Sequence, residues 1–212
     1  MIEAAIFDMD GTLLDTLEDL KESTNYALRK FKFPERTKEE VRKFVGNGVE
    51  KLFDRAVPKT ANDETKQTCI EIFKQHYEQN MYNNTAPYNS IPEILRELKL
   101  HGIKTGIVSN KFDKAVKILT KKYFSNLIDT AIGQAKDIPI KPAPQGVLKA
   151  MKEMKVKSAV YIGDSNVDIE TAHNANLKCI AVTWGFRDKN TLKNADYIVD
   201  TPEELLQVLR SL

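Results

Sequence analysis

Apolar residues follow two different periods along the chain, and the period changes with position. Residues 4–7 form a short unbroken apolar run, which is typical of a strand buried on both faces. From Asp15 to about Phe31, apolar side chains recur every three or four positions, so we expect an amphipathic helix there. Further helices are predicted at residues 37–44, 49–56 and 64–79.

After Pro87 the pattern becomes an alternation of apolar runs with helical periods. Such alternation is typical of a parallel sheet with helices on both faces. We therefore predict an α/β fold: a doubly wound parallel sheet formed by residues 1–14 and 86–212, with residues 15–85 inserted after the first strand as an all-helical cap domain. The predicted strands cover residues 103–108, 127–132, 159–162, 179–182 and 197–199, and the predicted helices cover residues 90–100, 112–122, 144–154, 167–175 and 202–209.

Two segments have the spacing of a capping box, in which a hydroxyl side chain and a Glu three residues later cap the start of a helix. One pairs Thr37 with Glu40, and the other pairs Ser90 with Glu93. We expect a capped helix to begin at each of them.

Composition narrows the class of protein. The 212 residues are enough for one substantial domain, or for a core with a smaller insertion. Hydrophobic residues make up 42% and charged residues 29%, as in ordinary globular proteins. The net charge of +2 argues against a dedicated nucleic-acid surface, and no apolar run is long enough to cross a bilayer. We expect no nucleic-acid or membrane partner, and a monomer or small homo-oligomer.

The two cysteines, Cys69 and Cys179, lie far apart and have no CxxC context. This argues against a zinc site and favours two free, buried thiols, as in a reducing cytoplasm. The N-terminus has no basic stretch followed by an apolar one, so we see no secretory signal. The expected location is therefore cytoplasmic.

Polar side chains follow four of the predicted strands, at the point where each strand ends. In open parallel sheets, ligands bind beyond the carboxyl ends of the strands, so we expect these residues to meet at one edge. They are Asp8 and Asp10 after the first strand, Ser109, Asn110 and Lys111 after the second, Lys141 after the third, and Asp164 and Asp168 after the fourth.

Together, these residue types are suited to binding a metal ion and a phosphate group and to acid–base chemistry. Carboxylates from two strands could hold a hard cation such as Mg²⁺, which prefers oxygen ligands. Ser109 is a small hydroxyl donor for a phosphate oxygen, and Lys141 is a point charge that suits a phosphoryl group. One carboxylate can act as a nucleophile and a second as general acid and base. Asp8 and Asp10 would share a face of an extended segment, although Asp-Gly is also common in plain turns.

Four motifs in this order resemble those of the haloacid dehalogenase superfamily, and the resemblance runs essentially from end to end. Residues 8–12 (DMDGT) match its first motif, DxDGT. Ser109 matches the second motif, Lys141 the third, and residues 163–168 (GDSNVD) the fourth, GDxxxD. The resemblance implies the superfamily's Rossmann-like core with a helical cap inserted after the first strand.

The resemblance also implies roles for single residues. Asp8 would be the nucleophile and Asp10 the general acid and base. Mg²⁺ would be held by the Asp8 side chain, the Asp10 backbone carbonyl and Asp164, with Asp168 in support. The phosphoryl group would be bound by Ser109 and Lys141, with help from backbone amides near Met9, Asp10 and Asn110.

Within the superfamily, the chain looks most like the phosphoglycolate phosphatases and their relatives. The similar segments are residues 45–48 in the cap, residues 182–187 and residues 195–205. The implied activity is hydrolysis of a small phosphorylated metabolite, with phosphoglycolate as the best candidate, through an aspartyl-phosphate. Alternatives are a sugar-phosphate mutase of the β-phosphoglucomutase kind, a pyrophosphatase or nucleotidase, and a non-catalytic phosphate-sensing module. Asp10 argues against a dehalogenase, which needs no leaving-group acid.

Several positions have two interpretations. Asp168 could cap the following helix instead of supporting the metal, and Asn110 could be a turn or cap residue. Lys111 is expected to be a solvated lysine at the start of a helix. Gly46 with Gly48 either breaks a helix or lets the cap backbone approach a small substrate, and Arg187 either reaches toward the cap or lies in solvent.

Overall fold

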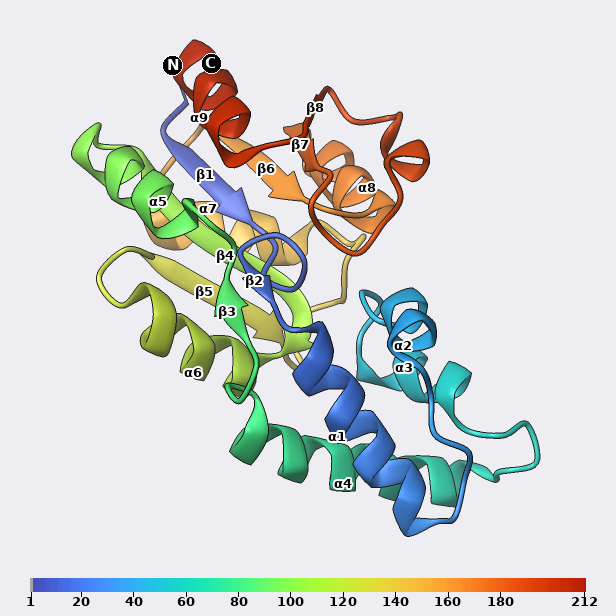
Figure 1. Ribbon diagram of the computed structural model, residues 1–212. Coiled ribbons are helices and arrows are strands. Elements are labelled where there is room, and N and C mark those ends of the chain that lie inside the picture. Colours follow the sequence, from blue (N-terminus) through green and yellow to red (C-terminus); the bar gives the residue numbers. More distant parts are fainter. Residues whose placement is uncertain (1) are drawn as a thin grey trace.

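The computed structural model describes residues 2–212 and contains a six-stranded parallel sheet (Figure 1). The strand order is β5-β4-β1-β6-β7-β8, so the chain winds outward in both directions from β1. This confirms the predicted α/β fold. The strands are β1 (Ala4–Phe7), β4 (Lys104–Phe112), β5 (Thr130–Gln134), β6 (Ala159–Gly163), β7 (Lys178–Val182) and β8 (Tyr197–Val199).

Helices cover both faces of the sheet, and every residue of the central strand β1 is therefore buried. Ala5 and Phe7 belong to one apolar cluster, and Ala4 and Ile6 belong to another on the opposite face. The first cluster contains residues of α5 (Ile91–Leu100), α6 (Asp113–Phe124) and α9 (Pro202–Ser211), and the second contains residues of α7 (Gln145–Met154) and α8 (Asn166–Asn174).

Four helices are inserted between the first strand and the rest of the sheet. The chain leaves through β2 (Leu14–Asp15) and returns through β3 (Ala86–Pro87), which pair antiparallel. The helices lie beyond the carboxyl end of β1 (Figure 1), within the range predicted to be all-helical. Their role as a separate cap domain stays a prediction. They are α1 (Leu17–Lys30), α2 (Lys38–Phe44), α3 (Val49–Ala56) and α4 (Asp63–Asn80).

Asp19 fixes the base of this helical insertion. Its carboxylate is 2% exposed and accepts hydrogen bonds from the backbone amides of Asn84 and Thr85 at 2.9–3.1 Å. It also accepts from the Asn84 side-chain amide at 2.9 Å and the Thr85 hydroxyl at 2.8 Å. The start of α1 is thereby tied to the segment that leads back into β3.

One of the two predicted capping boxes is present. At Thr37, the hydroxyl accepts from the Glu40 amide and the Glu40 carboxylate accepts from the Thr37 amide. The prediction at Ser90 was wrong. Ser90 has a left-handed backbone, φ 63°, and its hydroxyl donates to Glu203 instead. A capping hydroxyl needs an extended backbone to reach the amide three residues on.

The second predicted strand is longer than the sequence indicates. β4 continues to Phe112, with a shift of register against β5 between Val108 and Phe112. Ser109, Asn110 and Lys111 therefore lie in this irregular end of the strand, and all three are buried. The short strands β2 and β3 were not predicted, because two residues are too few to show a period.

Both cysteines are buried and unpaired, as predicted. Within residues 2–212, every helix is too short or too polar to cross a membrane.

We predict that Asp19→Ala lowers the free energy of unfolding by about 3 kcal/mol, because several buried donors lose an ionised acceptor. Urea denaturation measures this change. The control is Asp137→Ala, which removes an exposed carboxylate and should change stability by less than about 0.5 kcal/mol. Equal stability of the two variants would contradict the anchoring role of Asp19.

Candidate active site

The predicted site residues meet at the carboxyl edge of the sheet. Asp8 follows β1 directly, Asp164 follows β6, and Ser109 lies in the last part of β4. Lys141 reaches the same place from the loop between β5 and α7. All four side chains are buried. Residues that are far apart in sequence thus form one cluster, because parallel strands end at a common edge.

Lys141 is the centre of this cluster. Its ammonium lies 2.7 Å from Asp168 Oδ1, 3.0 Å from Asp8 Oδ1 and 3.0 Å from the Tyr161 hydroxyl. Tyr161 in turn donates to the carbonyl of Val108 at 2.8 Å. Burial opposes the charge, but the two carboxylates outweigh it and hold the pKa of Lys141 well above its usual range. The lysine is therefore a fixed positive charge.

One carboxylate oxygen of Asp8 is available to bind a ligand. Apart from the contact with Lys141, Asp8 Oδ1 accepts no hydrogen bond within residues 2–212, although it is buried. Burial raises the pKa of Asp8 to about 6, against the opposing effect of Lys141. A buried, under-bonded carboxylate oxygen is a candidate nucleophile or metal ligand.

Three buried carboxylates lie close enough to hold one ion. Within residues 2–212, Asp8, Asp164 and Asp168 each offer an oxygen, and these oxygens lie within 4.8 Å of one another. Burial, reinforced by the other two carboxylates, raises the pKa of Asp164 to about 8. One ammonium does not neutralise three carboxylates, so the donor set fits a hard divalent cation. The cluster does not include the Asp10 side chain.

Glycines allow the acidic loops to approach each other. Gly11 has φ +83°, and a Cβ there would lie 2.4 Å from Asp164 Oδ2. A Cβ on Gly163 would lie 2.3 Å from the Cβ of Asp168. Any other residue at either position would push a carboxylate out of the cluster.

Asp168 makes the helix cap that its sequence position allows, and it also contacts Lys141. One oxygen caps α8 by accepting from the Ser165 amide at 3.0 Å and the Ser165 hydroxyl at 2.6 Å. The other oxygen binds Lys141. Its direct support of a metal stays a prediction.

The Asp10 side chain has hydrogen-bond partners outside the cluster of Asp8, Asp164 and Asp168. Its carboxylate accepts a hydrogen bond from the Thr16 hydroxyl at 2.7 Å and from the Lys111 ammonium at 3.0 and 3.1 Å. The expectation of a solvated Lys111 was wrong, because its side chain is only 3% exposed. A buried partner from another strand cannot be recognised from local sequence.

Asn110 joins the core to the helical insertion. Its side-chain amide donates to the carbonyls of Gly46 at 3.0 Å and Lys141 at 3.1 Å, and its Oδ1 accepts from the Lys141 amide at 2.7 Å. The side chain is therefore engaged with backbone. The predicted role of Asn110 in phosphate binding concerns its backbone amide, and it stays a prediction.

Two arginines form a clasp between the insertion and the core, which we call the arginine clasp. Arg187, after β7, donates to the carbonyls of Arg42 at 2.6 Å and Val45 at 2.5 Å, at the end of α2. Arg42 donates back to the carbonyl of Phe186 at 2.6 Å and to Asp188 at 2.8 Å. Of the two interpretations of Arg187, the structure supports the one that reaches toward the helical insertion.

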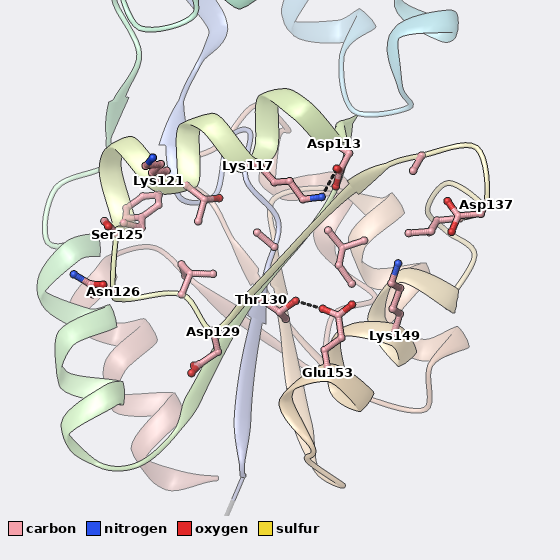
Figure 2. Close-up of a pocket in the computed structure, with 17 residues that line it drawn as sticks. Asp113, Lys117, Lys121, Ser125, Asn126, Asp129, Thr130, Asp137, Lys149 and Glu153 are labelled. Atoms are coloured by element: carbon pink, nitrogen blue, oxygen red, sulfur yellow. Dashed lines mark hydrogen bonds and ion pairs between the residues drawn. The ribbon is translucent and has the colours of Figure 1, made fainter.

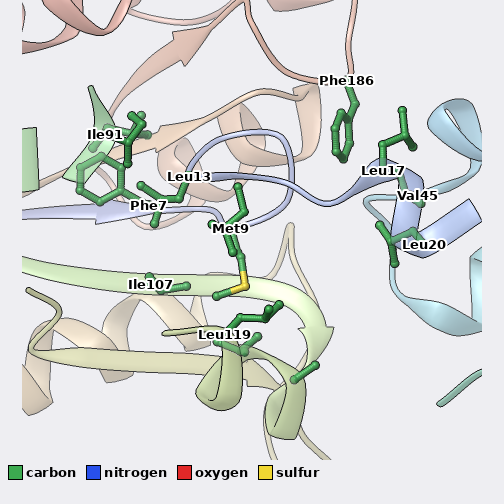
Figure 3. Packing of buried hydrophobic residues seen from close by; sticks show 14 of the residues in the cluster. Phe7, Met9, Leu13, Leu17, Leu20, Val45, Ile91, Ile107, Leu119 and Phe186 are labelled. Carbon is green, nitrogen blue, oxygen red and sulfur yellow. The ribbon is translucent and has the colours of Figure 1, made fainter. Parts of the chain in front are cut away.

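A small cavity lies between the insertion and the carboxylates. Its volume is about 50 Å³, and Asp8, Asp10, Ser109 and Lys111 line its polar side. Figure 3 shows how Phe186 of the core packs near Leu17, Leu20 and Val45 at this junction. The apolar side of the cavity is formed by Leu20, Val45, Val49, Leu52, Phe73 and Phe112.

A larger hollow of about 680 Å³ runs along the edge strand β5, between α6 and α7 (Figure 2). Two of its charged side chains have partners within the hollow: Lys117 pairs with Asp113 at 2.6 Å, and Glu153 accepts from Thr130. None of the residues that line it belongs to the buried carboxylate cluster. We therefore place the candidate active site at the smaller cavity.

Comparisons with known proteins agree on one family. The model of the haloacid dehalogenase-like hydrolases matches residues 5–182. A phosphoglycolate phosphatase of Aquifex aeolicus is 30% identical over 207 residues, which cover 96% of this chain and 95% of the relative. A candidate phosphoglycolate phosphatase of Lactobacillus delbrueckii subsp. bulgaricus has a crystal structure with a TM-score of 0.92, 34% identity and 99% coverage of both chains.

A third protein shares the fold at lower identity. It is the CbbY protein of Rhodobacter sphaeroides, solved as a mutant in complex with xylulose-1,5-bisphosphate. It is 22% identical, with a TM-score of 0.77 and 95% coverage of both chains.

We predict that Mg²⁺ stabilises the protein more at high than at low pH. Asp8 and Asp164 have folded-state pKa values above the unfolded ones, so the metal-free folded state binds extra protons and becomes less stable as pH rises from about 4 to about 8. Mg²⁺ should therefore raise Tm more at about pH 8 than at about pH 5. Thermal unfolding with EDTA or with Mg²⁺ measures this difference.

The matched variant is Asp164→Asn, which removes one buried carboxylate. Without metal at about pH 8, its Tm should exceed that of the wild type, and Mg²⁺ should raise its Tm less. Equal effects of Mg²⁺ on both proteins would contradict a metal site at Asp164.

We predict that Arg187→Met loosens the contact between the insertion and the core. Two charge-assisted hydrogen bonds are lost, so amide exchange in residues 42–49 should become about tenfold faster. Hydrogen exchange read by mass spectrometry tests this. Arg29→Met is the control, because Arg29 pairs with Glu35 within the insertion and should leave this segment unchanged. Unchanged exchange in Arg187→Met would rule out the clasp.

Proposed function

The chain belongs to the haloacid dehalogenase-like hydrolase family, and from that premise we propose that it is a magnesium-dependent phosphatase of small phosphomonoesters, with phosphoglycolate as the first candidate. The observation that carries the proposal is the under-bonded Asp8 oxygen beside the Lys141 ammonium, at the floor of a small cavity. The similarity to the phosphoglycolate phosphatase of Aquifex aeolicus extends over nearly the whole length of both chains, and it supports the choice of substrate.

In the proposed first step, an Asp8 carboxylate oxygen attacks the phosphorus of the substrate. The bond between phosphorus and the leaving oxygen breaks, and Asp10 gives its proton to that oxygen. Asp8 becomes an aspartyl-phosphate. Lys141 and Ser109 stabilise the charge on the phosphoryl oxygens, which is the main requirement of phosphoryl transfer.

In the second step, water attacks the phosphorus of the aspartyl-phosphate. Asp10, now ionised, takes a proton from that water, and the bond between phosphorus and the Asp8 oxygen breaks. Inorganic phosphate and the original carboxylate result. The position of Asp10 beside Thr16, outside the buried cluster of Asp8, Asp164 and Asp168, supports this division of roles.

Mg²⁺ would be held by Asp8, Asp164 and the Asp10 backbone carbonyl, with Asp168 in support. When bound, it would neutralise the excess negative charge of the carboxylates and of the phosphoryl group. Two of these ligands, Asp8 and Asp164, have raised pKa values in the metal-free protein, because their charged forms are buried close to other carboxylates.

Residues 15–85 would act as a cap domain that sets the size of the substrate. A water needs roughly 10–15 Å³ of cavity volume, so about 50 Å³ holds the equivalent of a few waters. This space suits a leaving group of a few heavy atoms and is small for a nucleoside or a sugar. The hydrogen bond from Asn110 to the Gly46 carbonyl would hold the cap loop close to that leaving group.

We predict that Asp8→Asn abolishes phosphate release, by at least about 10⁴-fold in kcat, because the nucleophile is lost while the shape of the side chain is kept. Release of phosphate from phosphoglycolate with Mg²⁺ measures the effect, and circular dichroism checks that the fold survives. Asp15→Asn, at the exposed exit toward the cap, is the control and should stay active. Activity in Asp8→Asn would end the proposal of a covalent mechanism.

Substrate identity is tested by ranking kcat/KM over small phosphomonoesters, pyrophosphate, nucleotides and β-glucose 1-phosphate with a bisphosphate primer. The expected order places phosphoglycolate first. Interconversion of glucose phosphate isomers would instead indicate a mutase, and faster turnover of pyrophosphate or nucleotides would indicate those activities. No turnover of any of them would favour a phosphate-sensing module.

A further inference from the structure

Lys111 is the only cationic side chain that lines the small cavity within residues 2–212. Its stem comes from the irregular end of β4, and its side chain is 3% exposed. The ammonium lies 4.4 Å from the centre of the Tyr77 ring, a cation–π contact. The Lys111 ammonium is therefore buried at the junction of core and cap. It has no role in the two proposed steps of the reaction.

The bonding of Lys111 is incomplete. Its ammonium has three donors, and within residues 2–212 its only hydrogen-bond acceptors are the two oxygens of Asp10, at 3.0 and 3.1 Å. Lys141, by comparison, has Asp168, Asp8 and Tyr161 around it. Apart from the face of the Tyr77 ring, the third donor has no acceptor within residues 2–212, so a ligand oxygen can bind there while the pair with Asp10 is kept.

Apart from Lys111, the polar side chains that line the cavity are neutral or anionic, namely Ser109, Asn110, Asp8 and Asp10. The cap side of the cavity is formed by apolar side chains, and burial of an unpaired carboxylate against them would cost several kcal/mol, on the order of the penalty for a desolvated ion. Asp8 and Asp10 would also repel a second anionic group. Those apolar side chains are Leu20, Val45, Val49, Leu52 and Phe73.

We propose that Lys111 binds a carboxylate at the non-phosphoryl end of the substrate and makes the enzyme selective for short phosphomonoesters that carry one. The inference rests on the proposed phosphatase function and names its specificity-determining residue. The ammonium bridges Asp10 and the substrate carboxylate. This bridge holds the leaving oxygen, which lies between phosphate and carboxylate in the substrate, next to the acid that protonates it.

A narrower role for Lys111 is to position Asp10 alone. The two roles differ in one measurable respect. A residue that only positions Asp10 affects every phosphomonoester equally, whereas a carboxylate ligand changes the ratio between a carboxylate substrate and a neutral one of the same size.

The test compares phosphoglycolate with its amide, phosphoglycolamide, in wild type, Lys111→Met and Lys111→Arg, with Mg²⁺ present. In the wild type, kcat/KM should favour the carboxylate by about 10- to 100-fold, the value of a charge-assisted hydrogen bond. In Lys111→Met this preference should fall to near one, mainly through a rise in KM for phosphoglycolate. Lys111→Arg keeps the charge and should restore part of the preference.

Binding supplies a second measurement that does not depend on turnover. Calorimetric titration of phosphoglycolate into Asp8→Asn and into Asp8→Asn/Lys111→Met should show about 10-fold or greater weakening in the double variant, with phosphoglycolamide binding unchanged. Melting temperatures show whether each variant is folded.

An equal loss for both substrates in Lys111→Met, with the ratio unchanged, would overturn the inference and leave Lys111 as a positioning residue. A wild-type enzyme that hydrolyses phosphoglycolate and phosphoglycolamide equally well would also overturn it, while the proposed phosphatase function would stand. A wild type that hydrolyses no phosphomonoester, p-nitrophenyl phosphate included, would overturn both.

Discussion

The buried ammonium of Lys141 is the interaction on which the site depends. It pairs with Asp168 at 2.7 Å and with Asp8 at 3.0 Å, and so joins the first turn of α8 and the end of β1 to the loop between β5 and α7. Loss of one member of such a buried set leaves an unpaired charge, which costs about 3–5 kcal/mol. The loop itself is held by Asn110, which exchanges hydrogen bonds with the Lys141 backbone.

This arrangement leaves the site with more negative than positive charge. Asp8, Asp164 and Asp168 form one buried cluster, and the Lys141 ammonium contacts two of them. Burial is the main cause of the raised pKa values of Asp8 and Asp164, and neighbouring carboxylates raise them further. Under the proposed function, such a cluster lowers the stability of the metal-free protein and is arranged in advance for a cation and a phosphoryl group. The trade of stability for function is common at active sites. Gly11 makes the close approach of Asp164 to the first loop sterically possible.

Much of the fold and the outline of the site could be predicted from local sequence. The period of the apolar residues indicated the inserted helices and the strands of the sheet, and the rule that ligands bind at carboxyl ends brought Asp8, Ser109, Lys141 and Asp164 together. The spacing of Ser90 and Glu93 failed to predict a capping box, because Ser90 has a left-handed backbone and its hydroxyl donates to Glu203 of α9.

What could not be predicted depends on contacts between distant residues. The burial of Lys111 follows from its pairing with Asp10, which lies 101 positions earlier. The arginine clasp joins residues 142–146 positions apart, and the resemblance of residues 182–187 to the family does not identify the partners of Arg187. Sequence period reports which face of an element is apolar, but it carries no information on which polar groups meet between the helical insertion and the core.

We propose above that Asp8, placed by Lys141, accepts the phosphoryl group of the substrate. Acid quench of the wild-type enzyme during turnover of phosphoglycolate, followed by mass spectrometry of its peptides, detects this intermediate. We expect an acid-trapped phosphoryl group on the Asp8 side chain. A phosphoryl group on any other side chain would contradict it.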